Sequence, residues 1–343
     1  MGPNFKRLSL NITTENLSLL LKLFTKVLPG FKELVLDISA SHGRQSAEAD
    51  AWSLAAKDLG IFLKYYSSTL TFLSMSSDVI QDLELLFDDL PFFPNLKELE
   101  LLAVFNSKTF SKRASFTKFI AMHSSTLEVF TVKGRPRTAT VHSSGTAYAV
   151  WLAQAPTGIE PVCSFSQLVL PKLQTLTIGI ENHIPYLIRF YPNLSSITPN
   201  LKKLTFSESS IKHTRLGKIL ESLALYDEQN ALQELSYICD SVCHATFDML
   251  SNKLPRLKSL TIMYTCKPTG DVDNWNTWPD FCAMMQTRHY PTWPVRYLRL
   301  LRASGCGEGH PCESDMKIVA ACISPHVVID TTWKCTCTCT VNS

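Results

Sequence analysis

The chain has 343 residues, of which 45% are hydrophobic, so it is long enough to bury a large core. Its formal net charge is only +3, from 33 basic and 30 acidic residues. This balance argues against a dedicated nucleic-acid-binding protein, because such proteins concentrate lysine and arginine on one surface. No apolar run reaches the roughly 18 residues that a membrane-spanning helix needs, so the sequence predicts no membrane contact.

The cysteines indicate a reducing compartment. There are 11 of them, an odd number at irregular spacings, which is typical of free thiols and not of a disulfide framework. The N-terminal region also has no convincing signal peptide, because its apolar stretch at 17–24 is short and contains Lys22. We therefore expect a cytoplasmic or nuclear protein.

A short pattern recurs along the chain, often with a proline two positions before it. An apolar residue is followed three and five positions later by two more. The last two alternate with polar residues, which places them on one face of a short strand. Four copies are PNLKELEL at Pro94–Leu101, PKLQTLTI at Pro171–Ile178, PNLKKLTF at Pro199–Phe206 and PRLKSLTI at Pro255–Ile262.

The pattern defines ten units, with a degraded eleventh at 326–330. Most units start 25 to 31 residues after the previous one, which is near the period of leucine-rich repeats. A single match means little, because three apolar residues in six are common, but ten in tandem are not. The units begin at Phe5, Phe31, Leu70, Leu96, Leu127, Leu173, Leu201, Leu232, Leu257 and Val295.

The segments between the units have apolar residues at helical spacing. The first segment, for example, has Leu17, Leu20, Leu21 and Phe24 before a Pro-Gly pair that ends the element. Strand, turn and helix in repetition predict an α/β leucine-rich-repeat solenoid of about ten irregular repeats, a curved horseshoe with an inner parallel β-sheet and outer helices. Helices are predicted at 14–28, 51–66, 79–87, 110–123, 184–191, 212–226, 243–253, 279–286 and 313–322.

Long insertions interrupt the repeats, but no shift in composition marks a domain boundary, so we expect a single leucine-rich-repeat domain over 1–343. The insertion at 134–167 is expected to project as a loop. The insertion at 267–294 contains Trp275, Trp278 and Trp293, which could form an exposed hot spot for a partner or cap the end of the core. A Cys-rich tail at about 334–343 is expected to be poorly ordered.

The units at Pro94–Leu101 and Leu254–Ile262 resemble the irregular repeats of fungal F-box/leucine-rich-repeat proteins. This resemblance covers most of the chain and implies an intracellular receptor that selects substrates for a cullin-RING ubiquitin ligase. In that family a helical F-box precedes the repeats and docks onto the ligase. The first unit here begins at Phe5, so we expect the F-box to be lost or to lie upstream of this sequence.

The alternating polar positions of the strands are expected to point into the concave face and to bind a protein or a ubiquitination substrate. Acidic residues gather in the second and fourth units, which would suit a partner with a basic segment. Ordinary solvated strand surface is the alternative reading. The predicted partner-binding residues are Arg7, Glu33, Asp37, Glu98, Glu100, Lys133, Lys203, Glu234, Tyr297 and Arg299.

The C-terminal region suggests a second hypothesis, a zinc-binding or cryptic catalytic module. Cys306, His310 and Cys312 lie in a glycine-rich stretch, and a Cys-Thr-Cys-Thr-Cys run follows at 335–339. Neither group contains the CxxC pair that is common in zinc sites, so free cysteines in a loop and a frayed tail are the favoured interpretation. We therefore predict no bound metal and no cofactor.

Motifs of the common enzyme classes are absent: the sequence contains no GxSxG, HExxH, P-loop or GxGxxG. His123, His213 and His244 fall on predicted helices and are most simply interpreted as surface or half-buried residues with satisfied hydrogen bonds. The sequence therefore predicts a non-enzymatic, monomeric protein-interaction module that binds neither nucleic acid nor membrane.

Overall fold

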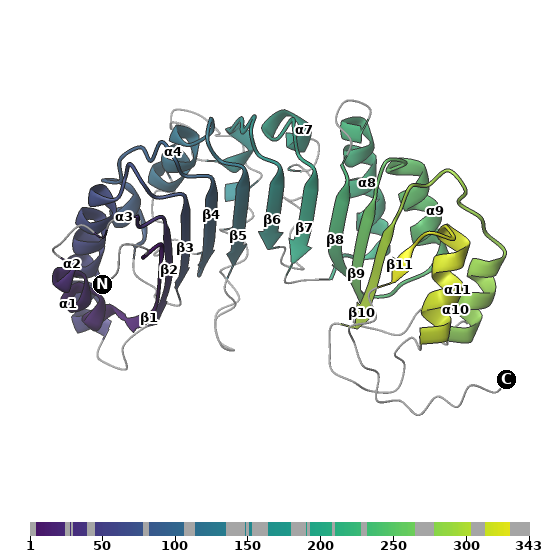
Figure 1. The fold of residues 1–343 in the computed structure, drawn as a ribbon, viewed down its shortest axis with the longest axis horizontal. Helices are drawn as coiled ribbons and strands as arrows, with labels where there is room; N and C mark the ends of the chain where they lie inside the picture. Colours follow the sequence, from purple (N-terminus) through teal and green to yellow (C-terminus); the bar gives the residue numbers. More distant parts are fainter. Residues whose placement is uncertain are drawn as a thin grey trace. The chain divides into compact units, whose positions relative to one another are not determined.

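The structure, a computed structural model, alternates strands with helical segments along the part of the chain that it describes (Figure 1). It forms two compact units, which we call unit 1 (Met1–Asn200) and unit 2 (Leu201–Ser343). The prediction of one domain over 1–343 stays a prediction. The residues described are 5–24, 28, 30–39, 45–77, 82–105, 114–134, 148, 151–152, 164–179, 190, 193–207, 210–227, 232–264, 278–302 and 313–329.

The described residues of unit 1 form six parallel strands that pair in the order of the sequence. The strands are β1 (Arg7–Thr13), β2 (Glu33–Ser39), β3 (Phe72–Ser77), β4 (Glu98–Ala103), β5 (Val129–Gly134) and β6 (Thr175–Gly179). The helices are α1 (Thr14–Leu23), α2 (Gln45–Tyr65), α3 (Glu84–Phe87), α4 (Ala114–Met122), the 3₁₀ helix η1 (Phe165–Gln167) and α7 (Leu194–Ile197).

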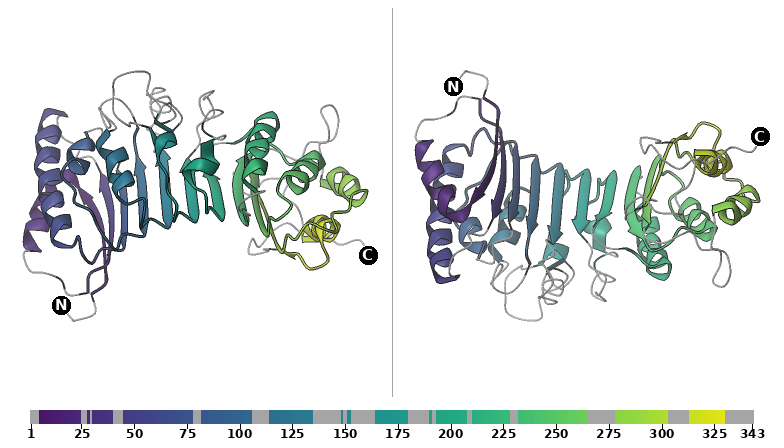
Figure 2. Two further views of the ribbon diagram at one scale, coloured as in Figure 1. Left: turned by 90° about the horizontal axis from the view of Figure 1, so that it is seen from above. Right: turned by 90° about the horizontal axis from the view of Figure 1, so that it is seen from below.

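Unit 2 repeats this arrangement of parallel strands with helices between them. Its strands are β7 (Lys203–Ser207), β8 (Glu234–Cys239), β9 (Ser259–Tyr264), β10 (Tyr297–Arg302) and β11 (Val328–Ile329). Its helices are α8 (His213–Asp227), α9 (His244–Lys253), α10 (Trp278–Gln286) and α11 (Glu313–Ile323). In each unit the helices lie on one side of the strands (Figure 2). The chain therefore has the α/β repeat fold predicted from its sequence.

Each strand begins two residues after the first apolar residue of a predicted unit. Leu96, for example, starts the fourth unit and β4 begins at Glu98. Leu96, Leu99 and Leu101 are 0%, 0% and 1% exposed, so all three apolar positions of this unit serve the core. Even the degraded unit at 326–330 contains a strand, β11. The apolar spacing thus predicts the position of the sheet and its inward face.

The recurrent proline occupies a tight turn just before the strand. In the fourth unit the Leu96 N–H donates to the Phe93 carbonyl oxygen at 3.1 Å, which closes a four-residue turn with Pro94 in its second position. Proline suits this position because its ring fixes the backbone angle φ that the turn requires. The side chain of Asn95 then donates to the Ser68 carbonyl oxygen of the preceding repeat at 2.6 Å. The Pro-Asn pair therefore forms the turn before the strand and links this repeat to the preceding one by a hydrogen bond.

Two ionisable side chains fasten repeats inside unit 1. His123 is 0% exposed; its Nδ1 lies 2.7 Å from the Phe119 carbonyl oxygen, and the Phe93 N–H donates to its Nε2 at 2.8 Å. This pattern requires a neutral imidazole with its proton on Nδ1. Glu84, 2% exposed, accepts the Ser115 N–H at 2.8 Å and so caps the start of α4. His123 is thus a core residue, deeper than the sequence indicated.

The insertion at 134–167 contributes to the core of unit 1, where the sequence predicted a projecting loop. Tyr148 and Trp151 are each 1% exposed. The Tyr148 hydroxyl donates to the Val132 carbonyl oxygen at 2.9 Å, and the Trp151 indole N–H donates to Thr117 Oγ1 at 3.0 Å. Two large aromatic side chains with satisfied polar atoms are more stable inside the core than in water, which explains the difference.

Unit 2 buries the tryptophans that its structure describes. Trp278 and Trp293 are 5% and 3% exposed, and the Trp293 indole N–H donates to the Leu254 carbonyl oxygen at 3.0 Å. These two residues therefore serve the core and not an exposed hot spot, and Trp275 lies outside the described residues. The stretch predicted as an insertion at 267–294 includes α10, the helix of a regular repeat.

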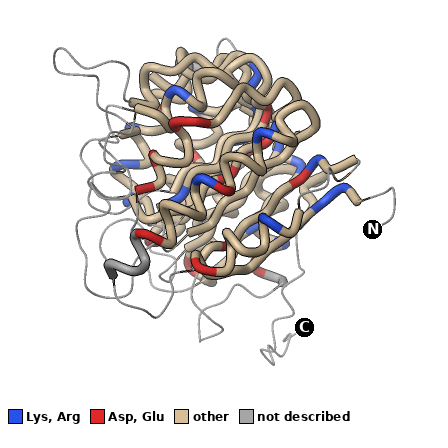
Figure 3. Tube along the Cα trace, turned by 90° about the vertical axis from the view of Figure 1, so that its left-hand side faces the viewer, with Lys and Arg blue, Asp and Glu red and all other residues tan. Residues whose placement is uncertain are grey.

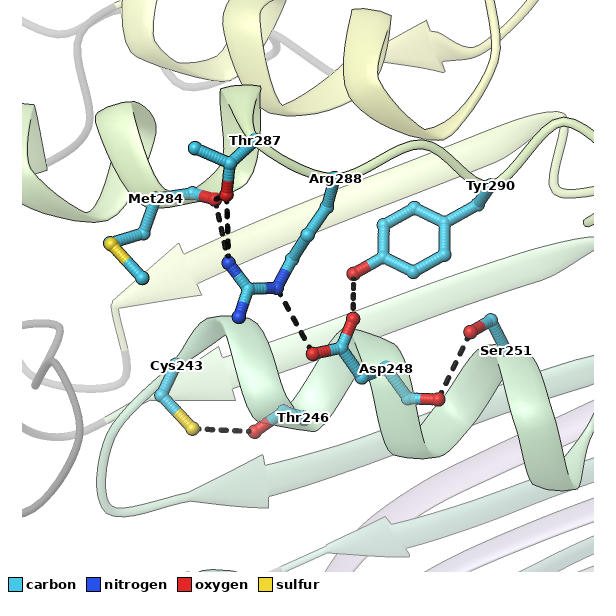
Figure 4. A network of polar contacts seen from close by, with 8 residues as sticks. All are labelled: Cys243, Thr246, Asp248, Ser251, Met284, Thr287, Arg288 and Tyr290. Atoms are coloured by element: carbon cyan, nitrogen blue, oxygen red, sulfur yellow. Dashed lines mark hydrogen bonds and ion pairs between the residues drawn. The ribbon is translucent and has the colours of Figure 1, made fainter.

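A carboxylate links α9 to the chain after α10 (Figure 4). Asp248 Oδ2 accepts from Arg288 Nε at 3.0 Å, and Asp248 Oδ1 accepts from the Tyr290 hydroxyl at 2.6 Å. Arg288 Nη1 also donates to the Met284 carbonyl oxygen at 2.9 Å. This network fixes α9 against the next repeat.

No helix in the described part of the chain is long and apolar enough to cross a membrane.

Candidate functional site

The sheet of each unit presents one face that its helices do not cover, which we call the open face. Side chains alternate along the strands between this face and the core, as in the iBiBiB burial pattern of β2. All ten predicted partner-binding residues lie on strands at open-face positions: Arg7, Glu33, Asp37, Glu98, Glu100, Lys133, Lys203, Glu234, Tyr297 and Arg299. The role of these residues in binding stays a prediction.

The parallel register places equivalent positions of successive units side by side. In unit 1 the residues at the first open-face position of each strand form a continuous row. Arg7 pairs with Glu33, Glu33 pairs with Phe72, and each later strand pairs with the next in the same register. The first row is Arg7, Glu33, Phe72, Glu98, Val129 and Thr175, and the second is Ser9, Val35, Ser74, Glu100, Thr131 and Thr177. Charged, apolar and hydroxyl side chains are therefore interspersed across this surface.

Opposite charges pair at the N-terminal edge of this face. Arg7 Nη1 lies 3.5 Å from Glu33 Oε2, and the Arg7 guanidinium lies 5.9 Å from the centroid of the Phe72 ring. Both members of the ion pair are well exposed, so the pair adds little to stability. Glu98 and Glu100 follow on β4, where the paired positions on β3 and β5 hold only Phe72, Ser74, Val129 and Thr131. These two carboxylates therefore have no charged side chain at the paired positions beside them.

Basic and acidic residues are interspersed at this end of the molecule (Figure 3). The two predicted basic residues and four predicted acidic residues of the unit 1 open face give it a net charge of 2 − 4 = −2. A nucleic-acid interface would need a continuous basic stripe. The open face of unit 1 is instead mildly acidic and rich in hydroxyl groups.

The open face of unit 2 differs in having an apolar row. Lys203 Nζ and Glu234 Oε2 form a cross-strand ion pair at 3.1 Å at the first position. At the third position Ile238 pairs with Met263, and Met263 pairs with Leu301, all three partly exposed. Tyr297 and Arg299 lie earlier on the same strand as Leu301. None of the ten predicted partner-binding residues belongs to this row, although its members occupy the same place in three successive units.

The residues of the zinc hypothesis, Cys306, His310, Cys312 and the cysteines at 335–339, lie outside the described residues, as does the tail at 334–343. Within the part of the chain that the structure describes, no group of three or more His, Cys, Asp and Glu side chains could hold a metal ion. The described cysteines Cys239, Cys243, Cys282 and Cys322 form no disulfide.

Comparisons with known proteins place no functional label on this chain. No protein-family model and no curated protein matches it. A crystal structure of a Bacteroides fragilis protein is similar with a TM-score of 0.41 and 13% sequence identity, over 90% of this chain and 68% of that chain. Similarity at this level carries no argument, so the fold assignment rests on the strands and helices described above.

Proposed function

We propose that this protein is a non-enzymatic interaction module that binds another protein on the open faces of its sheets. The observation that carries this proposal is the make-up of these faces: partly exposed apolar side chains stand in register beside charged and hydroxyl groups. Protein interfaces combine apolar contacts with polar groups in this way, whereas nucleic-acid interfaces are dominated by positive charge.

The partner that suits unit 1 is a polypeptide with a basic segment. Lysine or arginine of such a segment would face Glu98 and Glu100, while its apolar side chains would contact Phe72 and Val129 in the adjacent strands. Complementary charge of this kind mainly accelerates association and excludes wrong partners.

The resemblance of the repeats to fungal F-box/leucine-rich-repeat proteins supports a more specific role, the substrate-recognition part of a ubiquitin ligase receptor. A monomer in the cytoplasm or nucleus would fit this role, and free thiols are typical of those compartments. Recovery of ligase subunits with the tagged chain from its own cells tests this specific role separately from binding.

Selection from a random-peptide display library tests the binding proposal directly. The full chain is immobilised and the enriched peptides are sequenced and synthesised. We expect them to carry clustered Lys or Arg together with apolar residues. Failure to enrich any peptide, or enrichment of acidic peptides, would contradict the proposed function.

A charge-reversed variant then places the binding site. The double variant Glu98→Lys, Glu100→Lys should weaken binding of a selected peptide at least about tenfold, which corresponds to about 1.4 kcal/mol. The matched control is Glu221→Lys, the same change on an exposed position of α8, which should alter binding less than about twofold. Equal loss in both variants would show that net charge, and not the open face, governs binding.

A further inference from the structure

The N-terminal ends of α8 and α9 bring a cysteine and a histidine together in unit 2. Cys243 is the residue before α9 and His213 is the first residue of α8, 30 positions earlier. Cys243 Sγ lies 3.8 Å from His213 Nδ1 and 3.3 Å from Thr246 Oγ1, and this hydroxyl lies 3.3 Å from His213 Nδ1. A thiol, an imidazole and a hydroxyl thus form a closed triangle.

This position favours a thiolate. The first N–H groups of a helix and the helix dipole stabilise negative charge at its N-terminus, where Cys243 lies. Burial raises the pKa of the Cys243 thiol, but hydrogen bonds from His213 and Thr246 outweigh that effect, so that this pKa lies below the ordinary value of a thiol. In contrast, burial raises the pKa of Cys322.

Access also separates Cys243 from the other described cysteines. Cys243 is half-buried beside an exposed histidine, whereas Cys239, Cys282 and Cys322 are buried. The sulfur therefore combines nucleophilic character with access to small molecules, which are the two requirements for reaction with an oxidant.

A buried hydroxyl lies close to this site on β8. The Tyr237 hydroxyl is fully enclosed and has no hydrogen-bond partner among the described residues. Burial, and then the nearby thiols of Cys239 and Cys243, raise the pKa of Tyr237 well above its usual value. An unpaired buried hydroxyl is costly, so this part of unit 2 has a hydrogen-bonding group that no described residue satisfies.

The site is held on a rigid element. Asp248 on α9 binds both Arg288 and Tyr290, which fixes the helix that presents Cys243, and the Cys243–Thr246 contact lies on the preceding turn (Figure 4). The geometry of the thiol therefore does not depend on a free loop.

We propose that Cys243 is an oxidation site, whose thiolate reacts with hydrogen peroxide to form a sulfenic acid. His213 takes the thiol proton, and the sulfur attacks one peroxide oxygen. The S–O bond forms, the O–O bond breaks and the departing hydroxide takes the proton back from His213, so thiol and hydrogen peroxide yield sulfenic acid and water. Sulfur loses two electrons and peroxide gains them.

Sulfenic-acid trapping on the wild-type full chain tests this proposal. The chain is treated with hydrogen peroxide and a dimedone-type reagent at neutral pH, and adducts are quantified peptide by peptide by mass spectrometry. We expect Cys243 to react at least about tenfold faster than Cys322 and Cys282. Equal rates, or an unreactive Cys243, would overturn the proposal.

Two histidine variants test the role of His213. His213→Asn should slow adduct formation at Cys243 about five- to tenfold, because the thiol loses its proton acceptor. His289→Asn, the same change at an exposed residue beyond α10, should change the rate less than about twofold. An unchanged rate in His213→Asn would overturn the pairing of the two residues.

Discussion

The two units fasten their repeats with different chemistry. In unit 1 a neutral, fully buried imidazole, His123, joins α4 to the turn before β4 through the Phe93 N–H. In unit 2 a carboxylate, Asp248, joins α9 to the next repeat through Arg288 and the Tyr290 hydroxyl. The fold is the same, but the protonation state on which each contact depends is different. Stability against pH should therefore distinguish the two units.

The direction of each pKa shift determines whether acid or alkali destabilises a unit. Burial lowers the pKa of His123, so the unfolded chain takes up a proton below about pH 6.5 that folded unit 1 does not, and acid destabilises this unit. Burial and the hydrogen bond to Asp248 raise the pKa of Tyr290. The unfolded chain then loses a proton above about pH 10 that folded unit 2 retains, and alkali destabilises that unit.

The largest loss of stability should come from a substitution in the hydrophobic core. Leu99→Asp should destabilise unit 1 by at least about 4 kcal/mol, because an unpaired charge would replace a fully buried side chain. Urea unfolding followed by circular dichroism measures this loss. The control is Glu98→Lys, its exposed neighbour, which should change stability by less than about 1 kcal/mol. A stably folded Leu99→Asp chain would refute the assignment of strand faces.

His123→Asn should cost about 2–4 kcal/mol at neutral pH, because two buried backbone groups lose their partner. The wild-type unit loses up to about 1.4 kcal/mol of unfolding free energy per pH unit as the pH falls from 6.5 to the lowered pKa of His123. The variant should lack this loss. Hydrogen exchange of peptides from unit 1, measured from pH 7 to pH 5, checks both effects. An acid response that is the same in variant and wild type would assign it to other groups.

Tyr290→Phe should cost about 1.5–3 kcal/mol in unit 2 at neutral pH, through loss of the bond to an ionised carboxylate. Above pH 10 the free energy of unfolding of the wild-type chain should fall by up to about 1.4 kcal/mol per pH unit, and that of the variant should fall less. Denaturant midpoints between pH 9 and pH 11 provide the measurement. If the two curves stay parallel, the Tyr290 hydroxyl does not control the alkaline response.

The smallest effect on stability is expected at Glu84. Burial raises the pKa of its carboxyl group. The stability linked to its protonation is present below pH 4.5 and is lost as pH rises through the raised pKa, which is opposite in sign to His123. Glu84→Gln keeps an acceptor for the Ser115 N–H, so it should stabilise unit 1 by up to about 1 kcal/mol at pH 7 and by nothing near pH 4. Destabilisation at pH 7 would mean that the carboxylate charge supports the cap of α4.

The strands and most helices were predictable because they follow from local spacing. The three apolar positions of a unit specify where a strand begins and which face it buries, as at Leu96, Leu99 and Leu101. The burial of residues from the insertion at 134–167 was not predictable, because no periodicity marks Tyr148 and Trp151 as core residues. Their burial depends on partners at Val132 and Thr117, which only the folded chain brings near.

The open face was predictable as a set of positions, whereas contacts between repeats were not. Cys243 and His213 lie one repeat apart and meet because consecutive repeats stack. A search for chemically matched residues at one period could have found this pair. The depth of His123 was missed for the same reason, since its hydrogen-bond donor, the Phe93 N–H, comes from the previous repeat.

Photo-crosslinking tests the central claim, binding on the open face, most directly. A photoreactive amino acid is placed at Ser74 on the open face of β3, or at Lys118 on the exposed side of α4, and the chain is irradiated with a library-selected basic peptide. We predict crosslinks from position 74 and none from position 118. Crosslinks from position 118 alone would contradict the account.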